Sequence, residues 1–447
     1  MARAAARTGY IRGTAARRAR VDSGLARRRL RAVDHRPRSV TTVLFAAPLL
    51  SDAASRMVRA VGGLPGVRLG IITQDPVERA DGPTRAATSA HWRVDDVCDP
   101  AQLRWAVDAL SARLGPPDRL FGAYEKLQAP LAEERERLGI PGLSSEATHN
   151  FRDKARMKSV LRAAGVPCAR HGLAGTVAEA EAFADAVGFP LVIKPPAGAG
   201  SVATFRAGDA RELADALAAA PPTPDRPVLL EEFVTGEEHS LETISIDGRA
   251  VWHSLTRYRP TPLEVVRNPW IQWCIVLPRE VDDPRYDDIK AVGADALRAL
   301  GMTTGLSHME WFRRADGSVA IGEVGARPPG AQITTLVSRA TDTDFVRTWA
   351  ELMVFGTFTP PTRKYAAGIA FLRAQGDPGG RVRAVHGLDR LSDETKALAV
   401  DWQLPVIGAP PRPTYEGDGW VLVRHPETAP VERALQELIS VVRVELG

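Results

Sequence analysis

The chain has 447 residues, of which 44% are hydrophobic and 25% are charged. This is ordinary globular composition, which excludes disorder throughout, and the length predicts two or three domains. No apolar run approaches the roughly 20 residues that a membrane helix needs. The three cysteines, Cys98, Cys168 and Cys274, are odd in number and too far apart for a disulfide framework or a metal site, so a cytoplasmic location is expected.

The positive charge of the chain is concentrated in its first 38 residues. The formal net charge is +4, but residues 1–38 hold twelve arginines against Asp22 and Asp34 as the only acids, and this excess of ten leaves −6 for the rest. We expect 1–38 to form a basic, disordered tail, with a nucleic-acid or membrane-surface arm as the alternative. The remainder predicts no nucleic-acid partner and no membrane association.

From Ser39 onward, short apolar strands alternate with helices. This alternation predicts an open, mostly parallel sheet in a small α/β domain over about 39–147. The domain has no Gly-x-Gly-x-x-Gly phosphate motif, so we do not expect it to bind a dinucleotide. The predicted strands are 40–45, 67–72 and 119–124, and the predicted helices are 52–61 and 101–113.

The following segment contains helices with clear boundaries and a hairpin. Gly165 and Gly188 end two predicted helices, and Asp247-Gly248 predicts a tight turn between strands. Beyond about Thr359 we expect a separate cap of short strands with one C-terminal helix. The predicted helices are 153–164, 177–187, 209–220 and 430–442, and the predicted strands are 190–196, 228–234, 240–246 and 250–252.

A second hairpin, around Asp316-Gly317, carries the most informative pair of acids. If these two residues form the turn, Glu310 and Glu323 lie directly opposite each other, with Cβ atoms roughly 5 Å apart. Like charges in this position destabilise a sheet unless a cation lies between them, and two carboxylates with nucleotide phosphates commonly hold Mg²⁺. His308 would then face Gly325 beside the metal. The alternatives are two solvated glutamates and a packed histidine.

A lysine followed by glycines marks a possible phosphate loop. Lys194 ends an apolar strand and precedes a loop containing Gly198, Gly200 and Ser201. Backbone N–H groups of such a loop can contact phosphate oxygens, with the lysine as a point charge. Only seven of the 58 basic residues are lysines, so a lysine in this position is notable. An ordinary strand–loop junction is the alternative.

A cluster of acids flanks the turn at Thr235-Gly236. Carboxylates there could accept hydrogen bonds from an adenine amino group or a ribose hydroxyl, and the backbone of Phe233 and Val234 could read the adenine edge. The alternative is a solvated acidic strand end. The acids of this segment are Glu231, Glu232, Glu237 and Glu238.

In this order and spacing, the segments together resemble the ATP-grasp superfamily, in particular its carboxylate–amine (amino-acid) ligases. The resemblance implies an α/β protein of three domains after the basic tail. These are a preceding Rossmann-like α/β domain (39–147), an ATP-grasp domain of two α+β subdomains (148–356) and a small C-terminal α+β accessory domain (357–447).

The resemblance also implies roles for individual residues. ATP and Mg²⁺ would be the cofactors, with Mn²⁺ as an alternative metal. The implied nucleotide residues are Lys154 and Lys194 at the phosphates, the loop with Gly198, Gly200 and Ser201 over them, Glu231 with Phe233 and Val234 at the adenine, and Glu238 at the ribose. The implied metal ligands are Glu310 and Glu323, and Arg327 would stabilise the acyl-phosphate region.

One position departs from the pattern of the family. Where its members commonly have Asn two residues after the second metal glutamate, this chain has Gly325. One ligand of a second Mg²⁺ is therefore missing, which puts that part of the metal site in doubt.

The resemblance implies a ligase that phosphorylates a carboxylate to an acyl phosphate, which an amine then converts to an amide or peptide. The alternatives are a carboxylase-type enzyme that makes carboxyphosphate and a non-catalytic ATP-binding module. The expected partners are a small acid or amino acid and an amine, with a homodimer left open. A substrate pocket could come from the arginines and tryptophans between hinge and metal hairpin, which are Arg257, Arg259, Arg267, Trp270 and Trp273.

Overall fold

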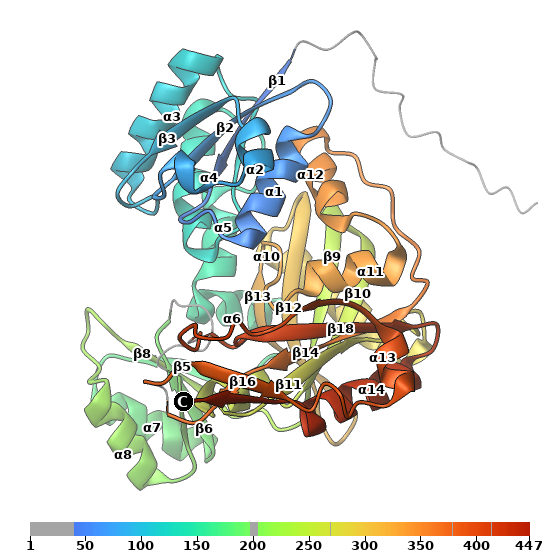
Figure 1. The fold of residues 1–447 in the computed structure, drawn as a ribbon. Coiled ribbons are helices and arrows are strands. Elements are labelled where there is room, and N and C mark those ends of the chain that lie inside the picture. Colours follow the sequence, from blue (N-terminus) through green and yellow to red (C-terminus); the bar gives the residue numbers. More distant parts are fainter. Residues whose placement is uncertain (1–39, 197–203, 269, 378, 413) are drawn as a thin grey trace, which may run out of the picture. The chain divides into compact units, whose positions relative to one another are not determined.

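A computed structural model of the chain describes residues 40–447 except 197–203, 269, 378 and 413 (Figure 1). The expected basic tail and the loop residues Gly198, Gly200 and Ser201 lie outside the described residues. The described part is a mixed α/β protein, as the sequence predicts. None of its helices is both long and apolar enough to cross a lipid bilayer.

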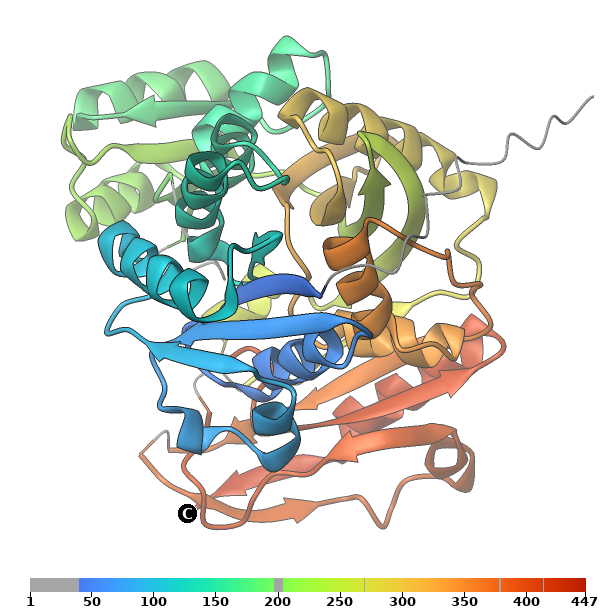
Figure 2. The same cartoon turned by 90° about the horizontal axis from the view of Figure 1, so that it is seen from above.

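The first sheet is parallel, with strand order β3-β2-β1-β4. Along β1 the side chains alternate between two cores: Val43 and Phe45 pack with α1, and Leu44 and Ala46 pack with α3. Both faces are covered by helices, which explains the uninterrupted apolar strands (Figure 2). The elements are β1 (Thr41–Ala46), α1 (Asp52–Gly62), β2 (Val67–Thr73), α2 (Gly82–Ala86), β3 (Ala90–Arg93), α3 (Pro100–Leu114), β4 (Arg119–Phe121), the 3-10 turn η2 (Glu125–Leu127), α4 (Gln128–Leu138) and α5 (Ser145–Arg152).

A second, antiparallel sheet has the order β5-β8-β6-β7. The helices beside it are capped by Thr176 and Asp209, which each accept a hydrogen bond from a backbone N–H of the first turn. The elements are α6 (Lys154–Ala163), β5 (His171–Ala174), α7 (Val177–Val187), β6 (Leu191–Lys194), β7 (Phe205–Ala207), α8 (Ala210–Ala219) and β8 (Val228–Glu232).

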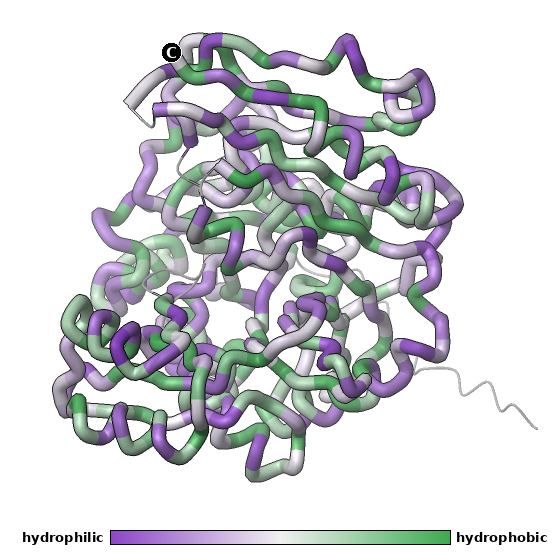
Figure 3. The backbone as a smooth tube through the Cα atoms, turned by 90° about the horizontal axis from the view of Figure 1, so that it is seen from below, coloured by the Kyte–Doolittle hydropathy of each residue, from purple (hydrophilic) through white to green (hydrophobic). Residues whose placement is uncertain are grey.

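The largest sheet has eight strands in the order β13-β12-β9-β10-β11-β14-β18-β17. The predicted turn at Asp247-Gly248 is confirmed, because both residues have positive φ and join β9 to β10. Hydrophobic stretches of the backbone alternate with hydrophilic ones along the chain in Figure 3. The elements of this part are β9 (Glu237–Ile246), β10 (Arg249–Arg259), α9 (Pro262–Arg267), β11 (Trp273–Leu277), α10 (Asp287–Leu300), β12 (Gly305–Arg313), β13 (Val319–Gly325), α11 (Ile333–Thr341) and α12 (Phe345–Phe355).

The C-terminal segment does not form the separate cap that we expected after about Thr359. Its strand β14 (Ala366–Leu372) pairs with β11 on one side and β18 (Gly419–His425) on the other, so it continues the largest sheet. Every residue of β14 is buried, as befits a central strand. There are also two helices here rather than one. The other elements are β15 (Ala374–Gln375), β16 (Val382–His386), α13 (Asp393–Leu398), β17 (Ala399–Gln403), α14 (Thr428–Val441) and β19 (Arg443–Leu446).

Candidate nucleotide and metal site

One cavity of about 750 Å³ brings together most of the residues that the sequence singled out. Its walls come from α6 and the β5-β8-β6-β7 sheet, from α9, and from β12 and β13 of the largest sheet. Arg327 is not among the lining residues. The predicted residues that line the cavity are Lys154, Lys194, Glu231, Phe233, Val234, Glu238, Glu310 and Glu323.

At one wall, a buried carboxylate holds two lysines. Lys194 Nζ lies 2.9 Å from Glu231 Oε2, and Lys158 Nζ lies 3.4 Å from Glu231 Oε1. Burial alone would raise the pKa of Glu231, but the two lysine charges outweigh it and the pKa is lowered. Glu231 is therefore a carboxylate engaged with lysines, whereas the sequence suggested an adenine contact.

Sequence reasoning gave Lys158 no role, although it is 1% exposed and lines the cavity. It follows Lys154 by one helical turn on α6, so both side chains lie on the same helix face. The scarcity of lysine in this chain was the signal that could have found it.

The two predicted metal carboxylates pair as expected, but by a different route. Glu310 lies opposite Glu323 in the β12–β13 hairpin. The turn is one residue longer than a two-residue Asp-Gly turn, since Arg314 N donates to Ser318 O, and Gly317 takes a positive φ of 83°. Gly322 is an extra residue in β13, and this bulge restores the pairing of the two glutamates.

The donors at this hairpin fit a Mg²⁺ ion that is bound together with a nucleotide. Lys154 Nζ lies 2.8 Å from Glu323 Oε1, so that carboxylate already has a cation beside it. Within the described ranges, no group of three or more His, Cys, Asp and Glu side chains gathers to hold a metal. The protein thus supplies two carboxylates, and phosphate and water oxygens would complete an octahedral Mg²⁺ shell.

Behind Glu310 lies a buried acid–histidine pair. His308 Nδ1 lies 2.9 Å from Glu242 Oε1, and His308 Nε2 lies 3.9 Å from Glu310 Oε1. Glu242 is 1% exposed and accepts hydrogen bonds from the hydroxyls of Ser240 and Thr256. Burial alone would lower the pKa of His308, but the two carboxylates raise it to about 9. His308 is thus a cation between two acids, next to the predicted metal position.

Glu238 faces the same carboxylates from β9. Its pKa is raised well above the ordinary value, first by removal from solvent and then by the charge of Glu310. This acid is therefore destabilised in its ionised form, and the charge of Lys194 offsets this only in part.

The predicted adenine hinge lies at the end of β8. The Phe233 backbone N donates to the Pro190 carbonyl at 3.0 Å, so this donor is not available to a nucleotide. The Arg206 guanidinium lies 4.9 Å from the centre of the Phe233 ring, and both residues line the cavity. An aromatic ring and a guanidinium plane there form a flat wall that carries a positive charge.

Arg327 lies just beyond β13 and is held by an acid from the N-terminal part of the chain. Its Nε donates to Glu125 Oε2, and Arg152 Nη1 lies 3.5 Å from the other oxygen of Glu125. Burial alone would lower the pKa of Arg327, but Glu125 raises it. A Cβ built on Gly325 would lie 3.5 Å from Glu125 Oε2, so Glu125 lies beside the position where the family commonly has Asn.

Of the arginines and tryptophans suggested for a substrate pocket, Arg257, Arg259, Trp270 and Trp273 are not among the residues that line this cavity. Arg257 and Arg259 both form ion pairs with Glu432 on α14. Trp273 is buried and stacks on Phe371, whereas Trp270 is exposed. The structure describes no side chain for Arg267. The alternative interpretation, surface arginines with a packed tryptophan, fits these contacts better.

Comparisons with known proteins agree with this geometry. Residues 153–247 match the family model "Carbamoyl-phosphate synthase L chain, ATP binding domain". An L-arginine-specific L-amino acid ligase of Bacillus subtilis is 24% identical over 260 residues, which cover 56% of this chain and 62% of that protein. An uncharacterized protein of Sinorhizobium fredii is 29% identical over 287 residues, covering 62% of this chain and 58% of that protein. The chain thus matches less than two thirds of the length of these relatives.

A solved structure extends the likeness to nearly the whole fold. The crystal structure of an L-amino acid ligase from Bacillus licheniformis has a TM-score of 0.73 at 20% identity and covers 91% of this chain and 99% of its own. Sequence match, relatives and fold agree with the ATP-grasp resemblance inferred from the motifs. Residues 153–247 therefore match an ATP-binding domain of this superfamily, and the described fold is similar to that of an ATP-grasp ligase.

Proposed function

We propose that this protein is an ATP-dependent carboxylate–amine ligase that forms an amide or peptide bond on a small acid or amino acid through an acyl phosphate. The observation that carries the proposal is the meeting of three lysines and two opposed carboxylates in one cavity. The likeness to L-amino acid ligases supports it further.

The proposed reaction has two steps. The γ-phosphoryl group of ATP passes to a carboxylate oxygen of the acid, and its bond to ADP breaks as the acyl phosphate forms. The amine then attacks the acyl carbon, loses a proton and displaces inorganic phosphate. Positioning and charge neutralisation supply most of the catalysis in both steps, so the protein needs no covalent nucleophile.

The lysines of the cavity would offset the phosphate charge. Lys154 and Lys194 point their ammonium groups at carboxylates of the cavity wall, and a nucleotide would compete for those groups. Glu310 and Glu323 would hold Mg²⁺, which when bound neutralises charge on the β- and γ-phosphates.

The other predicted residues would bind the ends of the two substrates. In this proposal Phe233 and Val234 contact the adenine and Glu238 contacts the ribose. Arg327 binds the carboxylate of the acid, since a guanidinium fork matches an oxyanion in a bidentate contact. Glu125 then acts as a positioning residue for Arg327.

Phosphate release from Mg·ATP, measured with pools of carboxylic acids and with or without amines, tests the proposal. Release that needs both an acid and an amine is the expected result. Glu323→Ala should abolish it, whereas Glu146→Ala, at a side chain 83% exposed on α5, should not. Release that needs bicarbonate instead would indicate a carboxylase-type enzyme, and ATP binding without release from any pool would indicate a non-catalytic module.

A further inference from the structure

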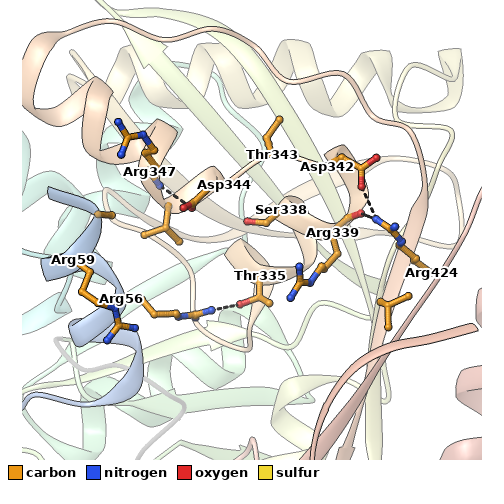
Figure 4. Close-up of a pocket in the computed structure, with 13 residues that line it drawn as sticks. Arg56, Arg59, Thr335, Ser338, Arg339, Asp342, Thr343, Asp344, Arg347 and Arg424 are labelled. Atoms are coloured by element: carbon orange, nitrogen blue, oxygen red, sulfur yellow. Dashed lines mark hydrogen bonds and ion pairs between the residues drawn. The ribbon is translucent and has the colours of Figure 1, made fainter. Parts of the chain in front are cut away.

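A second cavity, of about 780 Å³, shares no lining residue with the nucleotide cavity. Its walls come from α1, from α11 and α12 with the turn between them, and from β17 and β18. Five arginines and two aspartates line it, together with three hydroxyl side chains (Figure 4). The arginines are Arg56, Arg59, Arg339, Arg347 and Arg424.

Arg56 is the arginine of this cavity whose charge is least compensated. Its guanidinium donates to Thr335 Oγ1 at 2.7 Å and to Gln332 Oε1 at 3.4 Å, and both acceptors are neutral. Across residues 40–447, with the stated gaps, no ion pair of Arg56 is formed. Burial lowers the pKa of Arg56, and the more distant acids only partly offset this. An anion beside Arg56 would therefore relieve an unfavourable positive charge.

The other four arginines are paired with carboxylates, but the pairs are accessible to solvent. Exposed ion pairs contribute little to stability, so an incoming anion of higher charge can replace a carboxylate partner at small cost. Only one of the four partners, Asp342, lines the cavity itself. The pairs are Arg59–Asp81, Arg339–Asp401 and Arg424–Asp342, each at 2.6 Å, and Arg347–Glu351 at 3.2 Å.

We propose that this arginine cavity binds a small, multiply charged oxyanion that carries phosphate groups. Guanidinium forks bind phosphate oxygens in pairs, and five guanidinium groups line this one cavity. The volume is that of a site for a small molecule. The site is distinct from the nucleotide cavity and does not depend on the ligase reaction.

Binding of inorganic pyrophosphate, measured by titration calorimetry with EDTA present, tests the proposal. The double variant Arg56→Gln/Arg339→Gln should weaken binding by at least about tenfold, because each lost charged hydrogen bond costs about that much. Arg298→Gln is the matched control, since Arg298 is 69% exposed and pairs only with Asp295 on α10. Lys194→Gln tests the nucleotide cavity. Arg298→Gln should bind pyrophosphate as the unaltered protein does, and Lys194→Gln should keep the binding that the double variant loses.

Three results would overturn the proposal. They are no binding by the unaltered protein at millimolar pyrophosphate, equal weakening in Arg298→Gln, and loss of binding in Lys194→Gln alone. Citrate is a multiply charged anion without phosphate, so it tests whether charge alone is enough for binding. Binding of citrate as tight as that of pyrophosphate would overturn the assignment to phosphate. If the double variant does not fold, as judged from its thermal unfolding, Arg56→Lys replaces it. That variant keeps the charge but loses the fork, so a severalfold weakening is expected.

Discussion

Lys158 Nζ lies 2.9 Å from the carbonyl oxygen of Gly322, the extra residue of the β13 bulge. The same ammonium lies 3.4 Å from Glu231 Oε1. One buried lysine thus links the bulge that pairs Glu310 with Glu323 to the carboxylate that holds Lys194. The β12–β13 hairpin and Lys194 are therefore both positioned by Lys158 on α6, the hairpin directly and Lys194 through Glu231.

Lys158→Met should therefore affect both stability and nucleotide binding. The substitution removes the donor to the Gly322 carbonyl and one of the two cations beside Glu231. We therefore expect the free energy of unfolding to fall by about 1–3 kcal/mol. ATP affinity should fall by at least about tenfold, because the bulge and Lys194 lose their support. Chemical denaturation and nucleotide titration measure the two effects.

The control for this variant is Lys396→Met, on an exposed position of α13 whose Nζ donates to the Asp389 carbonyl. It should leave both quantities unchanged. Unaltered ATP affinity in Lys158→Met would show that the bulge does not need the lysine.

Glu238→Gln should stabilise the nucleotide-free protein while weakening ATP binding. The raised pKa of Glu238 means that the folded state binds a proton more tightly than the unfolded state does. Stability therefore falls as pH rises above the unfolded pKa of the group, and the neutral amide removes that loss. At pH 8 we expect a gain of about 1 kcal/mol.

Thermal unfolding at pH 5 and pH 8 measures the gain, which should be larger at the higher pH. Glu237→Gln is the matched control. Glu237 directly precedes Glu238 on β9, and its side chain is 82% exposed. A gain that is the same at both pH values would rule out the electrostatic cause.

The main features of the fold follow from the sequence. Where the structure differs from the prediction, contacts between distant segments are the cause. The apolar strands predicted over 40–45 and 67–72 are local signals, and the structure has strands over 41–46 and 67–73. The pairing of Glu310 with Glu323 was predicted from a two-residue turn. The real turn shifts the register by one, and the extra residue Gly322 restores it. The Gly322 carbonyl accepts a hydrogen bond from Lys158, which lies 164 residues away and could not be inferred from the hairpin alone.

Contacts between distant segments also explain what the sequence did not predict at the site and in the C-terminal part. The residues of β14 predict a buried strand but carry no information on which sheet it joins, and it joins β11. Glu231 was expected at the adenine, and only the fold shows that two lysines reach it. Likewise, nothing local to Arg327 indicates that Glu125, in the 3-10 turn after β4, holds its guanidinium.

His308→Gln should change how stability depends on pH. In the folded protein the pKa of His308 is raised to about 9 from an ordinary value near 6.5. The resulting stabilisation is complete below about pH 6.5 and is lost as pH rises through 9, and it amounts to at most about 3 kcal/mol. Urea unfolding between pH 6 and pH 10, without metal or nucleotide, measures it.

The unaltered protein should lose stability over this interval more steeply than His308→Gln does. His149→Gln, at an exposed position of α5, should follow the unaltered protein. Parallel curves for all three proteins would contradict the assignment of a stabilising charge to His308.

Glu125→Gln should impair use of the acid without impairing ATP binding. The Glu125 carboxylate holds Arg327 and also lies near Arg152, so a neutral amide leaves the guanidinium free to move. In the proposed reaction Arg327 binds the carboxylate of the acid. We therefore expect KM for the acid to rise, and kcat/KM to fall by about tenfold, with KM for ATP unchanged. Steady-state phosphate release with each substrate varied in turn gives KM for the acid and KM for ATP.

Glu133→Gln, at an exposed position of α4, is the control. An equal change in both KM values would mean that Glu125 supports the fold rather than the orientation of Arg327, since a loosened fold would weaken both sites together.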